Sequence, residues 1–274
     1  MAKKILIDAG HFSNYNQSKV YKNYYEGNSM WSLHNYLKKE LEAYGFIVHI
    51  TRTSRDKDLN VYNRGLLAKG YDLFISLHSN ACDDEKVDRV VIIKGYDQGD
   101  KLPSMLGEGL SQVIGVKQKY QIMTRKGSNG GEYYGVLRGA KAVGVKDRFI
   151  IEHGFHTNTN TAKWLYQEAN LKKLAKKEAE IIAEYYGVKK NTSSNTNINT
   201  NKVLYKVCIA SYKDKTNANI AVKEAIKKGY KDAYALKADN GYYRILIGTY
   251  SVKEYANNAI KEAEKKGYKG AFIV

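Results

Sequence analysis

One polar segment divides the chain into two parts that must fold around separate cores. Residues 191–201, NTSSNTNINTN, consist of Asn, Thr and Ser apart from Ile198. A segment of this composition buries too little apolar surface to order itself, so it is typical of a linker. The sequence therefore predicts two domains, residues 1–190 and residues 202–274, joined by a linker at residues 191–201.

The first segment alternates short apolar runs with longer amphipathic runs. Runs of strand length lie at residues 4–8, 46–51, 73–77, 89–94 and 149–151. Apolar residues spaced by three and four predict helices at residues 29–44, 61–69, 104–114 and 161–186. Strands that alternate with helices form a parallel or mixed sheet with helices on both faces, so the expected fold class is α/β.

The second segment contains an internal repeat. The sequence KEAIKKGYKDAYAL at residues 223–236 recurs as KEAEKKGYKGAFIV at residues 261–274. Each copy reads as a strand, an Ala-rich helix, a Gly-Tyr turn and a second strand. Two such halves packed side by side predict a small α+β domain of the ferredoxin-like βαββαβ type.

The chain is strongly basic, with 45 Lys and Arg against 28 Asp and Glu and a formal net charge of +17. This balance favours a polyanionic partner, either nucleic acid or an anionic cell-wall polymer, and charge alone does not choose between them. No zinc-finger or RNP-type pattern is visible in the sequence, so nucleic acid is not an expected partner. The two cysteines, Cys82 and Cys208, form neither a disulfide framework nor a CxxC metal clip.

The N-terminal sequence MAKKILIDAGH reads as a first β-strand, because its apolar run is too short for a signal peptide. The sequence has no run of about 18 apolar residues, so membrane insertion is not expected. We therefore expect a protein that is made in the cytoplasm without a signal peptide and that acts outside it only after release by another route.

Two histidines and two glutamates form a pattern that suits a metal-dependent hydrolase. His11 follows the first strand, His78 and Glu152 end two further apolar runs, and Glu26 precedes the first helix. The carboxyl ends of strands in an open α/β sheet present ligands and catalytic groups. Two imidazoles and one carboxylate suit a catalytic zinc with one position left for water, and the second carboxylate can serve as the base.

Each of these residues also has a plain structural interpretation. His11 alone could be a polar loop residue, Glu26 could favour the helix N-terminus through its charge, and Glu152 could pair with a nearby cation. We further expect Gly10 to let the chain turn sharply before His11, and Asp8 to orient the His11 ring. His153, next to Glu152, is expected on the opposite face of the sheet.

In this order the motifs resemble the zinc-dependent N-acetylmuramoyl-L-alanine amidases of the amidase-3 family, over residues 1–186. The matching motifs are IDAGH, Glu26, GFIVHITR, Arg64, FISLHSN and IIEHGFHTN. The resemblance implies a twisted, mostly parallel sheet flanked by helices. It also implies one Zn²⁺ in this domain and a catalytic carboxylate at Glu152. The implied zinc ligands are His11, Glu26 and His78.

Further residues around these motifs are expected to contact the substrate, namely Asn80, Arg64 and His156. The loop after DAGH departs from the family pattern, because Phe12, Ser13 and Asn14 stand where relatives commonly have glycines. This departure removes no ligand, and it bears on how the substrate fits.

The second domain resembles SPOR domains, which bind septal peptidoglycan, over residues 202–274. The resemblance rests on LYKVCIASY, KKGY, YYRILIGTY and GYKGAFIV. Tyrosines exposed on a sheet offer flat faces on which sugars can stack. The candidate wall-binding residues are Tyr212, Tyr243, Arg244 and Tyr250.

The implied reaction is hydrolysis of the amide bond between N-acetylmuramic acid and L-alanine in bacterial peptidoglycan by a zinc-activated water. We expect a phage endolysin that lyses its host, with peptidoglycan and anionic wall polymers as partners. Three alternatives stay open. They are a host amidase of sporulation or autolysis, a zinc peptidase that cleaves within the stem peptide, and a non-catalytic protein that binds cell wall or nucleic acid.

Overall fold

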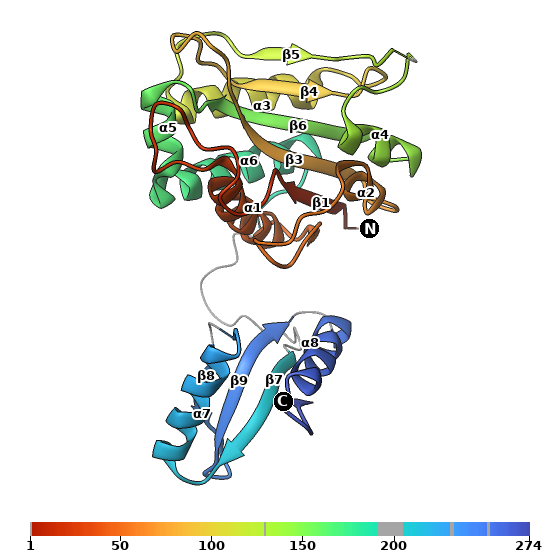
Figure 1. The fold of residues 1–274 in the computed structure, drawn as a ribbon. Coiled ribbons are helices and arrows are strands. Elements are labelled where there is room, and N and C mark those ends of the chain that lie inside the picture. Colours follow the sequence, from red (N-terminus) through yellow and green to blue (C-terminus); the bar gives the residue numbers. More distant parts are fainter. Residues whose placement is uncertain (1, 129, 191–204, 231–232, 251–252) are drawn as a thin grey trace. The chain divides into compact units, whose positions relative to one another are not determined.

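The computed structural model describes residues 2–128, 130–190, 205–230, 233–250 and 253–274 (Figure 1). The chain separates into two compact units, Met1–Ser193 and Ser194–Val274. The predicted linker at residues 191–201 lies outside the described residues. Within the described part of the chain, no helix is long and apolar enough to cross a membrane.

The first unit is built on a six-stranded sheet. Its strands are β1 (Lys4–Ala9), β2 (Ile47–Ile50), β3 (Leu73–Asn80), β4 (Val91–Lys94), β5 (Gln121–Met123) and β6 (Asp147–Phe155). They lie in the order β2-β1-β3-β6-β4-β5. Neighbouring strands are parallel except β4 and β6, which are antiparallel. The predicted α/β fold with a mostly parallel sheet is confirmed.

Helices cover both faces of this sheet (Figure 1). They are α1 (Glu26–Ala43), α2 (Val61–Leu66), α3 (Lys101–Ile114), α4 (Gly135–Ala142), α5 (Thr159–Tyr166) and α6 (Glu168–Tyr185). Side chains alternate between the faces of a strand. Ile5 and Ile7 of β1 therefore pack with α1, α3, α5 and α6, whereas Leu6 packs with α4 on the other face.

Several predicted boundaries differ from the structure, and those at α1, β6 and α5–α6 matter most. Helix α1 begins at Glu26 instead of residue 29, which places Glu26 in the first helical turn. Strand β6 continues to Phe155, so Glu152 lies inside a strand instead of at its end. The single helix predicted at residues 161–186 is two helices, because Gln167 between α5 and α6 has an extended backbone with ψ of 119°.

The apolar pattern predicts neither β5 nor α4. Strand β5 has three residues and lies at the edge of the sheet, where β4 is its one partner among the described strands. Helix α4 packs closely against α2 through glycines, which sequence patterns treat as helix breakers. A Cβ at Gly65 would lie 2.1 Å from the carbonyl oxygen of Val136, and one at Gly139 would lie 2.2 Å from that of Tyr62.

The second unit is a four-stranded antiparallel sheet with two helices. Its elements are β7 (Tyr205–Tyr212), α7 (Lys215–Lys227), β8 (Tyr234–Lys237), β9 (Tyr243–Tyr250), α8 (Lys253–Lys265) and β10 (Phe272–Ile273). The strand order β10-β7-β9-β8 is the ferredoxin-like arrangement that the repeat predicts. The small side chains Ala218 and Ala225 of α7 and Ala256 of α8 pack onto Val207 and Ile245 of the sheet.

Candidate active site

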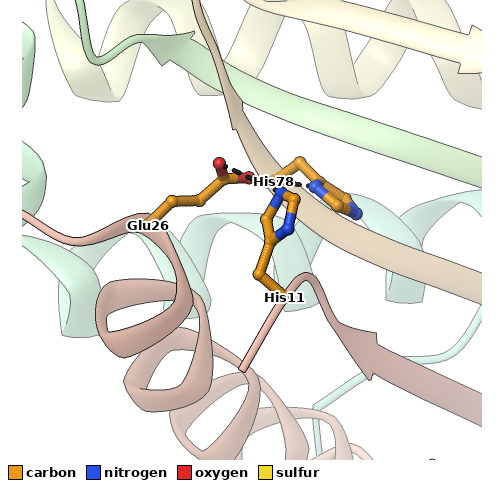
Figure 2. A group of neighbouring side chains, drawn as sticks. All are labelled: His11, Glu26 and His78. Atoms are coloured by element: carbon orange, nitrogen blue, oxygen red, sulfur yellow. Dashed lines mark hydrogen bonds and ion pairs between the residues drawn. The ribbon is translucent and has the colours of Figure 1, made fainter. Parts of the chain in front are cut away.

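His11, Glu26 and His78 come together from three separate segments of the chain (Figure 2). His11 follows β1, Glu26 begins α1 and His78 lies in β3. The Glu26 carboxylate faces both rings, with Oε1 2.9 Å from His78 Nδ1 and Oε2 3.3 Å from His11 Nε2. One ligand atom from each residue lies within 4.8 Å of the others. Two imidazole nitrogens and a carboxylate oxygen at this spacing are a donor set that zinc accepts.

The Glu26 side chain is 1% exposed and is held at both oxygens. Oε1 accepts the main-chain N–H of Ser79 at 3.0 Å, and Oε2 accepts a hydrogen bond from the Asn16 side chain. Burial alone would raise the pKa of Glu26, but hydrogen bonds from His11 and His78 outweigh it and hold the pKa well below its usual range. Glu26 is therefore ionised, which is the form that binds a metal.

The His78 ring lies against the main chain of Gly10. A Cβ at residue 10 would lie 2.4 Å from Cε1 and 2.6 Å from Nδ1 of His78. The left-handed turn occurs one residue later, at His11, with φ of 58°. The predicted role of Gly10 is thus corrected, because Gly10 makes room for His78. Burial lowers the pKa of His78, but the hydrogen bond and charge of Glu26 raise it to about 9.

The loop after β1 contains three non-glycine residues with left-handed backbone, namely His11, Asn14 and Asn16. This conformation is uncommon for residues with a side chain, and Asn tolerates it better than most. Arg52, which is 3% exposed, donates hydrogen bonds from its guanidinium to the carbonyl oxygens of Ala9 and His11. The Arg52 side chain thereby ties the turn at His11 to the segment after β2.

Glu152 is the register partner of His78 on the neighbouring strand, so the two side chains share one face of the sheet. Its Oε2 atom is buried and has no hydrogen-bond partner among the described residues. Burial raises the pKa of Glu152 to about 7, although the charge of His78 opposes the shift. His153 points to the opposite face, as predicted, where its Nε2 lies 3.3 Å from Glu178 Oε2 of α6.

The three predicted substrate-binding residues differ in their exposure. Asn80 ends β3, is partly exposed, and accepts the main-chain N–H of His156 at its carbonyl oxygen at 2.8 Å. Arg64 is buried in α2, with its guanidinium 3.4 Å from Asp8 Oδ2. His156 is also buried, and its Nδ1 lies 2.9 Å from Ser79 Oγ. Substrate contacts by these residues stay predictions, and the side chains of Arg64 and His156 have partners within the protein.

The structure places Asp8 differently from the sequence prediction. Its carboxylate accepts hydrogen bonds from Thr51 and Ser76 and pairs with Arg64, instead of orienting His11. Sequence reasoning did not single out Ser76, Arg52 or Asn16 for the site. Two of them could have been found from the sequence. Arg52 ends the motif GFIVHITR, and Ser76 precedes His78 by two residues, so it lies on the same strand face as His78. Asn16 could not have been found in this way.

The candidate wall-binding residues of the second unit lie on β7 and β9. Tyr212, Tyr243 and Tyr250 are partly buried against the core cluster between the sheet and its helices. Arg244 follows Tyr243 in β9, so it faces the other side of the sheet, beside its register partners Ser211 and Leu236. A wall-binding role for these four residues stays a prediction.

Comparison with protein families identifies both units. Residues 5–184 match the family Amidase_3, described as N-acetylmuramoyl-L-alanine amidase, and residues 201–274 match the SPOR domain. The first match spans well over half of the 274 residues. The chain belongs to the Amidase_3 family. Zinc dependence is a property of Amidase_3 enzymes, and His11, Glu26 and His78 fit such a metal site. Peptidoglycan is the substrate of this enzyme class, so membership favours a hydrolase over a non-catalytic binding protein.

Individual relatives of this Amidase_3 chain agree with the assignment. It is 25% identical over 211 residues to N-acetylmuramoyl-L-alanine amidase CwlM from Bacillus licheniformis, covering 76% of this chain and 74% of CwlM. The catalytic domain of CwlV from Bacillus (Paenibacillus) polymyxa var. colistinus superposes with a TM-score of 0.58 at 19% identity, covering 68% of this chain and 99% of that structure. Cwp6 from Clostridium difficile gives a TM-score of 0.56 at 22% identity, covering 67% of this chain but only 29% of Cwp6. These structural likenesses show the fold.

Proposed function

We propose that this chain cleaves the amide bond between N-acetylmuramic acid and L-alanine of peptidoglycan, with His11, Glu26 and His78 as the ligands of one zinc ion. The observation that carries the proposal is the convergence of His11 Nε2, His78 Nδ1 and the Glu26 carboxylate, beside a buried oxygen of Glu152 that lacks a partner among the described residues. When bound, zinc supplies the Lewis acidity that polarises the scissile carbonyl and lowers the pKa of water.

In this proposal Glu152 moves the proton. Its carboxylate accepts a proton from the attacking water and returns it to the nitrogen of L-alanine as the amide bond breaks. A pKa of about 7 suits both steps, because the group can gain and lose a proton near neutral pH. General acid–base catalysis of this kind contributes about 10²–10⁴-fold to the rate. In this proposal, the burial that raises the pKa of Glu152 is therefore what suits Glu152 to proton transfer.

The decisive variant is Glu152→Gln, which keeps the size of the side chain and removes its ability to accept a proton. We expect it to bind one zinc per chain and to lose about 10²–10⁴-fold of its hydrolysis rate on purified peptidoglycan. Glu178→Gln is the matched control, because Glu178 is a buried carboxylate on the opposite face of the sheet. Near-normal hydrolysis by Glu152→Gln would remove Glu152 from the base role. A wild-type chain without stoichiometric zinc would remove the metal site.

The bond that is cleaved can be identified from the products. A zinc peptidase that cuts within the stem peptide would use the same ligand types, so zinc analysis alone does not separate the two reactions. Mass spectrometry of digested peptidoglycan does separate them. A stem peptide with a free L-alanine amino group supports the amidase, whereas new termini inside the stem peptide would support the peptidase.

We propose that the SPOR domain holds the enzyme on the cell wall through Arg244, because the three tyrosines pack toward the core whereas Arg244 follows Tyr243 and faces the other side of the sheet. The full-length Arg244→Ala variant should cosediment less with peptidoglycan than wild type. Lys223→Ala is the control, because it removes the same charge from an exposed position on helix α7. Equal loss of binding in both variants would point to net charge instead of a site at Arg244.

We also propose that the enzyme acts as a phage endolysin, which is made in the host cytoplasm and reaches the wall after the membrane is pierced. The combination of an amidase domain with a SPOR domain and a net charge of +17 supports action on an anionic wall. Expression in a Gram-positive host with and without a membrane-permeabilising protein tests the role. Lysis that requires both proteins supports an endolysin, and lysis without permeabilisation would support a host autolysin.

A further inference from the structure

A chain of hydrogen-bonding groups leads from His78 into the interior of the first unit. The second ring nitrogen of His78, Nε2, lies 3.1 Å from Ser76 Oγ, and Ser76 Oγ donates to Asp8 Oδ2 at 2.8 Å. Ser76 and Asp8 are completely buried. The three side chains share one face, because Ser76 precedes His78 by two residues in β3 and Asp8 is the register partner of Ser76 in β1.

The carboxylate of Asp8 determines the direction in which Ser76 donates its hydrogen bond. Its Oδ1 accepts a hydrogen bond from Thr51 Oγ1 at 2.6 Å, and its Oδ2 lies 3.4 Å from the buried guanidinium of Arg64. The Ser76 hydroxyl has a single proton, and it donates this proton to Asp8 Oδ2. The Ser76 oxygen is then left to accept a hydrogen bond from His78 Nε2.

We infer that Ser76 is a positioning residue for the metal site. By accepting the Nε2–H of His78, it keeps the proton on that nitrogen, so Nδ1, which faces Glu26 at 2.9 Å, is the nitrogen that loses its proton when zinc binds. This inference rests on the proposed function, because it requires His78 to be a zinc ligand. Ligand histidines commonly donate their second N–H to a carboxylate, a carbonyl or water. Here the Ser76 hydroxyl accepts the hydrogen bond from His78 and donates one in turn to the buried Asp8.

The test compares two serine-to-alanine variants of the same strand. Ser76→Ala removes the acceptor of His78 Nε2. Ser79→Ala removes a hydroxyl that contacts Tyr24 and His156 instead, and it leaves the main-chain N–H that Glu26 accepts. Zn²⁺ affinity is measured by competition with a chromophoric chelator. We expect the zinc dissociation constant to rise about 10–100-fold in Ser76→Ala, the range for groups that orient a ligand, and to be unchanged in Ser79→Ala.

A second measurement needs no variant. In zinc-loaded wild type labelled with ¹⁵N-histidine, NMR should show the proton of His78 on Nε2 and the metal on Nδ1. A proton on Nδ1, or wild-type zinc affinity in Ser76→Ala, overturns the inference while the proposed zinc amidase stands. A wild-type chain that binds no zinc overturns the proposed function and this inference with it.

Discussion

Alanine at position 10 should displace a proposed zinc ligand. The added Cβ would lie 2.4 Å from Cε1 of His78 and 2.6 Å from both His78 Nδ1 and the Leu77 carbonyl oxygen. Non-bonded carbon atoms need about 3.5–4.0 Å, so the His78 ring must move by about 1 Å. A zinc site tolerates changes of only about 0.2 Å in its ligand distances. In Gly10→Ala the ring of His78 therefore cannot reach the metal position that His11 and Glu26 define.

We expect the zinc affinity of Gly10→Ala to fall by more than about 100-fold, the upper end of the effect of losing a group that merely orients a ligand. Chelator competition measures the affinity, and the turbidity of a peptidoglycan suspension follows hydrolysis. Gly99→Ala is the control, because a Cβ there would meet nothing within 4 Å. Thermal unfolding of the metal-free chains separates a local shift from loss of the fold. A folded Gly10→Ala variant with wild-type zinc affinity would refute this reasoning.

Other perturbations test the electrostatics. Burial lowers the pKa of His34 to about 4. The chain should therefore lose about 3 kcal/mol of unfolding free energy as the pH falls from about 6.5, the value for unfolded His, to about 4. His34→Asn should flatten urea-unfolding stability across that window, and an unchanged slope would contradict the assignment. Glu132→Gln weakens the 2.7 Å contact with buried Arg148 and should destabilise the fold by about 3 kcal/mol. Zinc affinity should stay the same, because Arg148 lies about 13 Å along β6 from Glu152. A loss of zinc affinity in Glu132→Gln would show that the Glu132–Arg148 pair is coupled to the metal site. Excess EDTA should abolish hydrolysis and added Zn²⁺ should restore it, whereas full activity in EDTA would exclude the metal.

The fold could be predicted where burial requires a recognisable apolar pattern in the sequence. The interior strands β1, β3 and β6 carry continuous apolar runs, because helices cover both of their faces. The edge strand β5 and helix α4 have no such apolar pattern. They depend on partners, β5 on pairing with β4, and α4 on the close approach of Gly65 and Gly139. The break at Gln167 was equally hidden, since the apolar spacing continues across it without glycine or proline.

The sequence by itself determined which chemistry the protein can perform. Motif order was enough to name His11, Glu26 and His78 as a candidate donor set, because ligand chemistry depends on side-chain type. Only the tertiary structure decided how these groups are held. Strand register places Glu152 beside His78 and Asp8 beside Ser76, and a shift of one residue would send these side chains to the opposite face. Contacts between segments distant in sequence therefore decide which nitrogen of His78 faces Glu26 and which buried carboxylate has a raised pKa.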